Sequence, residues 1–184
     1  LADNLKVNTS TNNDDIINAV DVIVLAVKPQ ILSSVAKNAA TSIQRKQNLV
    51  VSIAAGISQH SLSQWLGDNI AIVRCMPNTP ALVLTGATAL HANALVTTEQ
   101  HDLAENIMRS VGITLWVNDE SELDVVTAVS GSGPAYYFLL MEAMEKAAIE
   151  MGMNEVTARL LVQQTALGAA KIALESSESP EQLR

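Results

Sequence analysis

The sequence of 184 residues has one cysteine, few aromatic residues and no long apolar run, and each shortage excludes a class of protein. Because Cys75 has no second cysteine to pair with, an internal disulfide framework is excluded and a cytoplasmic location is expected. The longest unbroken apolar run, 135–141, covers about two helical turns, whereas ~20 residues are needed to cross a bilayer. We therefore expect no membrane partner, and the first residues do not have the pattern of a signal peptide.

Positive charge is also scarce. Eleven Lys and Arg residues face 19 Asp and Glu residues, a net charge of −8, so we expect no nucleic-acid partner. The aromatic content of 3% is too low for a base-stacking surface. His60, His91 and His101 show no ligand spacing with Cys75, so no metal site is expected.

A glycine-rich phosphate-binding loop is missing as well. A nicotinamide enzyme built on a parallel α/β sheet should carry Gly-x-Gly-x-x-Gly after its first strand, and the sequence has no such run. Only about 20 residues precede the apolar run 22–27, whereas one βαβ unit needs roughly 30 or more. We therefore expect the phosphate-binding unit to lie upstream of Leu1 and the sheet to be incomplete at that side.

Apolar runs alternate with helical stretches over the first two thirds of the chain, which predicts an α/β fold with a parallel sheet. The runs are continuous rather than alternating, which indicates strands buried on both faces. Strands are predicted at 22–27, 49–56, 70–74 and 113–117, with helices at 31–43, 58–66 and 97–111.

From Asp119 onward the pattern predicts helices and no strand. The helices are expected at 133–151, at 154–175 and from 179 to the chain end. The first two carry apolar residues on several faces, which they cannot bury against each other alone. We therefore predict an α/β domain over 1–119 and an all-helical dimerisation domain over 120–184, both incomplete.

Candidate ligand-binding segments follow the predicted strands, because ligands of open parallel sheets bind outside the carboxyl ends of the strands. These segments are 26–29, 54–56 and 76–80. Taken singly they are weak signals, and Lys28 could equally be a solvated lysine. The Ser130–Pro134 segment could offer free backbone N–H groups to an anion, or it could be a hinge into the long helix.

Four motifs resemble, in order and spacing, those of pyrroline-5-carboxylate reductases: Leu25-Ala26-Val27-Lys28-Pro29-Gln30, Val50-Val51-Ser52-Ile53-Ala54-Ala55-Gly56, Arg74-Cys75-Met76-Pro77-Asn78-Thr79-Pro80 and Ser130-Gly131-Ser132-Gly133-Pro134-Ala135-Tyr136. The resemblance covers essentially the whole chain. It implies a Rossmann-type parallel sheet followed by a helical domain that interleaves with its twin in a homodimer, with dimers assembling further. It also implies hydride transfer from NADPH or NADH to 1-pyrroline-5-carboxylate, giving L-proline in the last step of proline biosynthesis.

The same resemblance implies residue roles. The nicotinamide would be lined by Ala26, Val27, Lys28, Pro29, Ile53, Ala54 and Ala55, and the adenosine ribose would be approached by Asn13. The substrate would be bound by Glu120, Glu178, Ser132 and Gly133. A carboxylate beside the ring nitrogen favours the protonated iminium, which accepts hydride more readily, and we hypothesise Glu178 in this catalytic role. The family's Ser-Pro-Gly-Gly-Thr-Thr substrate loop is absent from the sequence.

Two alternatives stay open. A β-hydroxyacid dehydrogenase has the same two-domain plan but should show a catalytic lysine in its helical domain. Lys146 and Lys171 are present there, and neither sits in such a motif. A non-enzymatic alternative is a degenerate reductase relative that serves as a dimerisation module.

Overall fold

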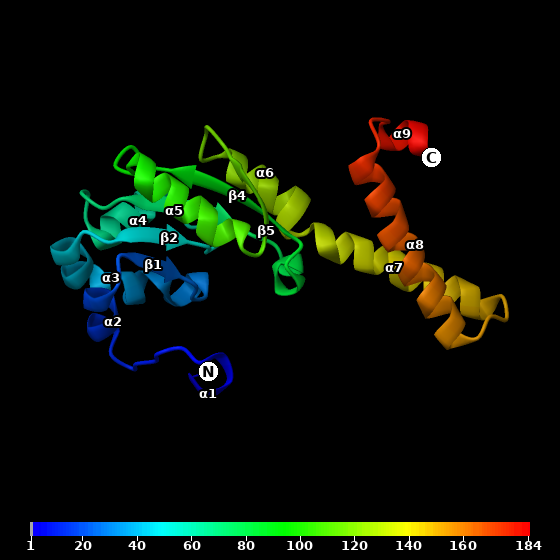
Figure 1. The fold of residues 1–184 in the computed structure, drawn as a ribbon, viewed down its shortest axis with the longest axis horizontal. Helices are drawn as coiled ribbons and strands as arrows, with labels where there is room; N and C mark the ends of the chain where they lie inside the picture. The colour runs from blue at the N-terminus through cyan, green and yellow to red at the C-terminus, as the bar shows by residue number, and fades with distance from the viewer. Residues whose placement is uncertain (1) are drawn as a thin grey trace. The chain divides into compact units, whose positions relative to one another are not determined.

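The structure, a computed structural model, describes residues 2–184 and divides into two compact units, the first ending at Ser132 and the second spanning Gly133–Arg184. The first unit holds, in chain order, α1 (Ala2–Leu5), α2 (Asn13–Ala19), β1 (Val22–Leu25), α3 (Pro29–Lys46), β2 (Leu49–Ser52), α4 (Gln59–Leu66), β3 (Ile72–Met76), the 3₁₀ turn η1 (Thr79–Val83), β4 (Gly86–Ala92), α5 (Thr98–Arg109), β5 (Gly112–Trp116), α6 (Glu122–Val126) and the π-helical turn η2 (Thr127–Gly131) (Figure 1). None of the described helices combines the length and the apolar character that a membrane span requires.

The five strands form one sheet in the order β1-β2-β3-β4-β5. β1, β2 and β3 are parallel, as predicted, but β4 pairs antiparallel with β3, and β5 is parallel to β4. The predicted parallel sheet is therefore confirmed in most of its pairings; the sequence pattern predicts no strand at β4, which reverses the direction, and β5 follows β4. The connection over 77–85 has nine residues, fewer than the dozen or so that a parallel crossover needs, so the chain must turn back.

Two hydrophobic layers enclose the sheet. On one face α3 and α4 pack against β1, β2 and β3, through residues that include Leu32, Ile43 and Leu62. On the other face Ala104 and Met108 of α5 pack against β2, β3 and β4. All four residues of β2 are buried, as expected for a continuous apolar run, whereas in β1 Val24 is 43% exposed, so that strand is not covered on both faces.

Helix boundaries in this unit follow local sequence signals. α5 begins with a capping box at Thr97 and Gln100, in which each side chain accepts a hydrogen bond from the other residue's backbone. α3 has Pro29 in its first turn, where a missing N–H costs nothing. The α6–η2 segment packs against β3 and β4, and the first unit therefore extends to Ser132, beyond the predicted domain boundary at 119/120.

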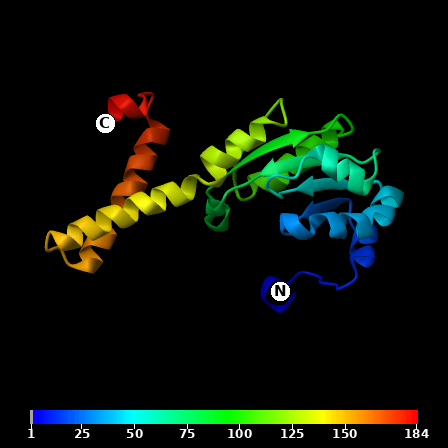
Figure 2. The ribbon, with the colours of Figure 1, turned by 180° about the vertical axis from the view of Figure 1, so that it is seen from behind.

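The second unit is helical, as predicted, with α7 (Gly133–Glu150), α8 (Glu155–Glu175) and α9 (Pro180–Leu183). α7 and α8 are in contact and form a helical hairpin, drawn in yellow to red in Figure 2. Of its described residues only Gly133, Ala158 and Val162 are buried. Large apolar side chains are exposed along both helices: Phe138, Leu139, Leu140, Met144, Leu160, Leu161, Leu167 and Ile172.

Candidate functional site

The carboxyl ends of β1 and β2 lie side by side and bring together the residues predicted to line a nicotinamide. The N–H of Ile53, just past β2, donates to the carbonyl of Leu25 at 3.3 Å. This bond sets the segment 26–29 beside the segment 53–55. The structure therefore places all seven of these predicted residues along one edge of the sheet.

Each of the two segments has a local reason for its shape. Lys28 is exposed at the N-cap position of α3, and its carbonyl accepts the N–H of Ile31 at 3.1 Å. The N–H of Ala54 donates to Ser52 Oγ at 3.4 Å, and Gly56 has a φ of +73°, which reverses the chain toward α4. Small side chains and turning backbone leave room at this edge for a flat ring.

A pocket of about 270 Å³ opens beside β1 and connects this edge with α2. Asn13, Ala26 and Val27 line it, together with apolar residues of α2, β1 and α3. Asn13, predicted to approach the adenosine ribose, thus lies in the same pocket as two of the residues predicted to face the nicotinamide.

The carboxyl end of β3 meets the Ser130–Pro134 motif. Asn78 Nδ2 donates to Ser130 Oγ at 3.2 Å, across 52 residues of sequence. A Cβ placed on Gly131 would lie 2.5 Å from Met76 Cε, so the glycine lets the turn lie directly on the methionine. The family resemblance includes both motifs, 74–80 and 130–136, but their sequences do not indicate that Asn78 and Ser130 are bonded.

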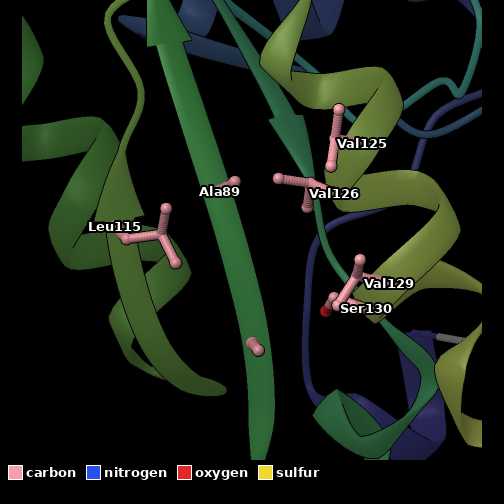
Figure 3. A pocket seen from close by; sticks show the side chains of 7 residues that line it. Ala89, Leu115, Val125, Val126, Val129 and Ser130 are labelled. Atoms are coloured by element: carbon pink, nitrogen blue, oxygen red, sulfur yellow. The ribbon is translucent and has the colours of Figure 1, made fainter.

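An apolar groove of about 260 Å³ lies next to this contact, between β4, β5 and the α6–η2 segment. Figure 3 shows Ala89 on the strand between Leu115 on one side and Val125, Val126 and Val129 on the other. Apart from the Ser130 hydroxyl, its lining is apolar. The groove can therefore hold an apolar surface but offers few polar groups for orienting a ligand.

Glu120, predicted to bind substrate, is held by two partners in the first unit. Its Oε1 accepts from Arg74 at 2.5 Å and from the N–H of Gln59, the first residue of α4, at 2.6 Å. Arg74 is buried, with 8% of its surface exposed, so this carboxylate neutralises a charge that water does not reach. The sequence alone does not reveal this structural role. A contact with substrate stays a prediction.

The other predicted substrate residues lie at the end of the first unit and in the second unit. Ser132 is half-buried at the end of the first unit, and Gly133 is the buried first residue of α7. Glu178 is exposed in the turn between α8 and α9, where its N–H donates to Ser176 Oγ at 3.0 Å. The catalytic role of Glu178 stays a prediction.

Cys75 is buried in β3, as expected for a small residue within a strand. Burial raises the pKa of its thiol from 9.0 to about 12, because the thiolate loses its hydration. The thiol therefore stays protonated and is a poor nucleophile at neutral pH. Among the side chains that the structure describes, His, Cys, Asp and Glu form no group of three that could hold a metal ion.

Open α/β sheets bind ligands, dinucleotides among them, outside the carboxyl ends of their parallel strands, where this edge lies. Two family models match the chain: "NADP oxidoreductase coenzyme F420-dependent" over residues 1–56 and "Pyrroline-5-carboxylate reductase dimerisation" over residues 120–184. The pyrroline-5-carboxylate reductase of Pseudomonas aeruginosa is 48% identical over the whole of this chain and 67% of its own length. That of Haemophilus influenzae is 45% identical over 95% of this chain and 64% of its own length.

Solved structures give the same result. The reductase from Coxiella burnetii superposes with a TM-score of 0.92 at 44% identity, covering 100% of this chain and 68% of its own. The Plasmodium falciparum pyrroline carboxylate reductase, solved with NADP bound, gives a TM-score of 0.90 at 32% identity, covering 98% of this chain and 68% of its own. The chain belongs to the pyrroline-5-carboxylate reductase family. It spans about two thirds of the length of these relatives.

Proposed function

We propose that the protein reduces 1-pyrroline-5-carboxylate to L-proline with NADPH or NADH, the last step of proline biosynthesis. The observation that carries this proposal is the shared edge of β1 and β2, where the segments 26–29 and 53–55 lie together. Family membership supports it, and so does the NADP bound to the Plasmodium relative.

The residues of this edge fit a nicotinamide ring. Ala54 and Ala55 have short side chains, and a Cβ on the neighbouring Gly56 would meet no atom within 4 Å, so the backbone can approach a flat ring closely. Val27 and Ile53 are half-buried apolar side chains that keep water from the ring's face. When bound, the reduced cofactor supplies a hydride to the carbon of the substrate's C=N bond.

The step that this chain's own acidic groups assist is protonation of the nitrogen in the substrate's C=N bond. A carboxylate close to the nitrogen favours the iminium over the neutral imine, and the amine of L-proline keeps the proton after hydride addition. We propose Glu178 for this role, and Glu120, Ser132 and Gly133 for binding the substrate.

The test of the activity uses the full-length protein. We expect it to oxidise NADPH or NADH when 1-pyrroline-5-carboxylate is added, and to leave β-hydroxyacids unreacted with NADP⁺ or NAD⁺. The ratio of the kcat/KM values for the two reduced nucleotides decides the cofactor preference. Oxidation of β-hydroxyacids would favour the dehydrogenase alternative, and no reaction with either substrate would favour the non-enzymatic one.

The role of Glu178 is tested by Glu178→Gln, with Glu181→Gln as a matched control in the next helix. Loss of a group that assists proton transfer lowers kcat by about a hundredfold. Glu181 lies in the first turn of α9, exposed like Glu178, and its substitution should leave kcat unchanged. An unchanged kcat in Glu178→Gln would remove Glu178 from the mechanism.

We also propose that the protein is a homodimer formed through α7 and α8, with dimers assembling further. The exposed apolar residues of these helices support a partner surface, as does the dimerisation model that begins at residue 120. Because this family match begins at residue 120, it supports the predicted domain boundary at 119/120. The compact first unit nevertheless runs on to Ser132. A cytoplasmic location stays a prediction that rests on the single cysteine, which is buried and free.

A further inference from the structure

Asn78 occupies a helix-cap position without capping the helix. It precedes η1 with extended backbone angles, φ −129° and ψ 167°, and its side chain makes no hydrogen bond to that turn. Asparagine at such a position normally accepts from a backbone N–H two or three residues on. The Asn78 side chain is therefore free to bond to other segments, and both of its polar atoms do so.

The side-chain oxygen extends the sheet. Asn78 Oδ1 accepts the N–H of Ala87 at 2.9 Å. Met76 pairs with Ala89 in the β3–β4 ladder, and Asn78 and Ala87 lie two residues further along the same register. Because a backbone N–H can only donate, this bond also fixes which end of the Asn78 amide faces Ser130.

The side-chain nitrogen reaches the turn that precedes α7. Asn78 Nδ2 donates to Ser130 Oγ at 3.2 Å, within η2, whose π-type bond runs from the N–H of Ser132 to the carbonyl of Thr127 at 2.8 Å. Such single π turns lack the regular hydrogen bonds of an α-helix and are frequent at functional sites. A side-chain bond to Ser130 therefore restrains a turn that its own backbone bonds hold less firmly.

This contact stands beside the nicotinamide-facing edge. β2 and β3 are parallel neighbours in which Ser52 pairs with Arg74, so Ala54 and Met76 each lie two residues beyond that pair. Met76 in turn touches Gly131. A displacement of η2 would therefore move atoms directly next to the residues proposed to face the nicotinamide ring.

We propose that Asn78 is a positioning residue for the reductase reaction: it joins the start of β4 to Ser130 and so holds the Ser130–Ser132 segment in place beside the nicotinamide-facing edge. This proposal rests on the proposed function. Asn78 acts through Ser130 and not through contact with the substrate.

The test compares Asn78→Ala with Asn93→Ala in the full-length protein. Asn93 is a matched control, because it too joins sheet backbone: its Oδ1 accepts from Ile72 N at 3.1 Å and its Nδ2 donates to Ile70 O at 2.9 Å. Both substitutions should lower the melting temperature. Only Asn78→Ala should lower kcat, by about tenfold or more, while the Kd for NADPH stays within about twofold.

Ser130→Ala tests the connection and keeps the bond between Asn78 and Ala87. We expect it to lower kcat about as much as Asn78→Ala does, and the double variant to be no slower than Asn78→Ala alone. Ser130→Thr, which keeps the hydroxyl, should restore most of the rate. Backbone hydrogen exchange over 127–131 should quicken in Asn78→Ala and not in Asn93→Ala.

The proposal is overturned if kcat of Asn78→Ala stays within about twofold of wild type, or if Asn93→Ala loses as much. Independent, multiplying losses in the double variant would also overturn it, as would unchanged exchange over 127–131. Failure of the wild-type protein to oxidise NADPH with 1-pyrroline-5-carboxylate would instead overturn the proposed function. The exchange measurement then still decides whether Asn78 holds the turn.

Discussion

The two units of the chain differ in how far their apolar side chains are buried. Nearly all of the buried apolar side chains among the described residues lie in the first unit, and only Ala158 and Val162 lie in the second. In the second unit residues such as Leu160 and Leu167 are 62% exposed. The first unit therefore completes its core from its own chain, whereas the helices of the second leave apolar surface that a further surface must cover.

The largest effect that tests this difference is on association. In the double variant Leu160→Glu, Leu167→Glu the two substitutions lie seven residues apart on one face of α8. Any interface formed there would then have to bury their charges. Since each subunit brings two such charges, we expect the dimer dissociation constant to rise by about ten-thousandfold or more, measured by analytical ultracentrifugation. Leu95→Glu, at a residue 46% exposed in the first unit, should leave association unchanged. Equal weakening by both changes would contradict the comparison.

A smaller effect is expected on the stability of the first unit. Leu62 is fully buried between α4 and the sheet, and Leu62→Ala should lower the free energy of unfolding by about 2–5 kcal/mol. Leu160→Ala, studied at concentrations where the protein is dissociated, should change it by less than about 1 kcal/mol. Urea unfolding of both variants measures the contrast. A similar loss in Leu160→Ala would show that the second unit has a core of its own.

The smallest effect concerns one ion pair in each unit. Glu120→Gln weakens the link to the buried Arg74 and should lower the free energy of unfolding by about 1–3 kcal/mol. The Glu142–Lys146 pair lies exposed on α7, so Glu142→Gln should cause no measurable change. Thermal unfolding of the two variants measures this. If Glu120→Gln is as neutral as Glu142→Gln, the Arg74 charge has other compensation.

The sequence predicts most of the fold because its apolar runs are strong and continuous. Strands β1, β2, β3 and β5 and the three long helices α3, α7 and α8 all lie where the pattern predicts them. Strand β4 has no such signal, since Gly86–Ala92 is mostly small residues with low strand propensity. Its position comes from pairing with neighbours on both sides, a tertiary effect that a local pattern does not contain.

The candidate site is predictable in part. Segments 26–29 and 54–56 could be singled out as ligand-binding candidates because the carboxyl ends of neighbouring parallel strands meet at one edge, whereas their nicotinamide role comes from the family resemblance and stays a prediction. The bond of Glu120 to Arg74 and the bond of Asn78 to Ser130 could not be predicted, because each joins residues that are more than 40 positions apart. Such bonds depend on how α6 and η2 cross the sheet, which no local spacing records.

The reversed direction of β4 and β5 has a mechanical consequence. Because β5 runs opposite to β3, the chain leaves the sheet away from the carboxyl end of β3 and comes back to it through α6 and η2. This returning segment is fastened to the β3 region at both ends, to Arg74 through Glu120 and to Asn78 through Ser130. The segment acts as a brace, so that a shift of the carboxyl end of β3 would carry the turn at Ser130 along with it.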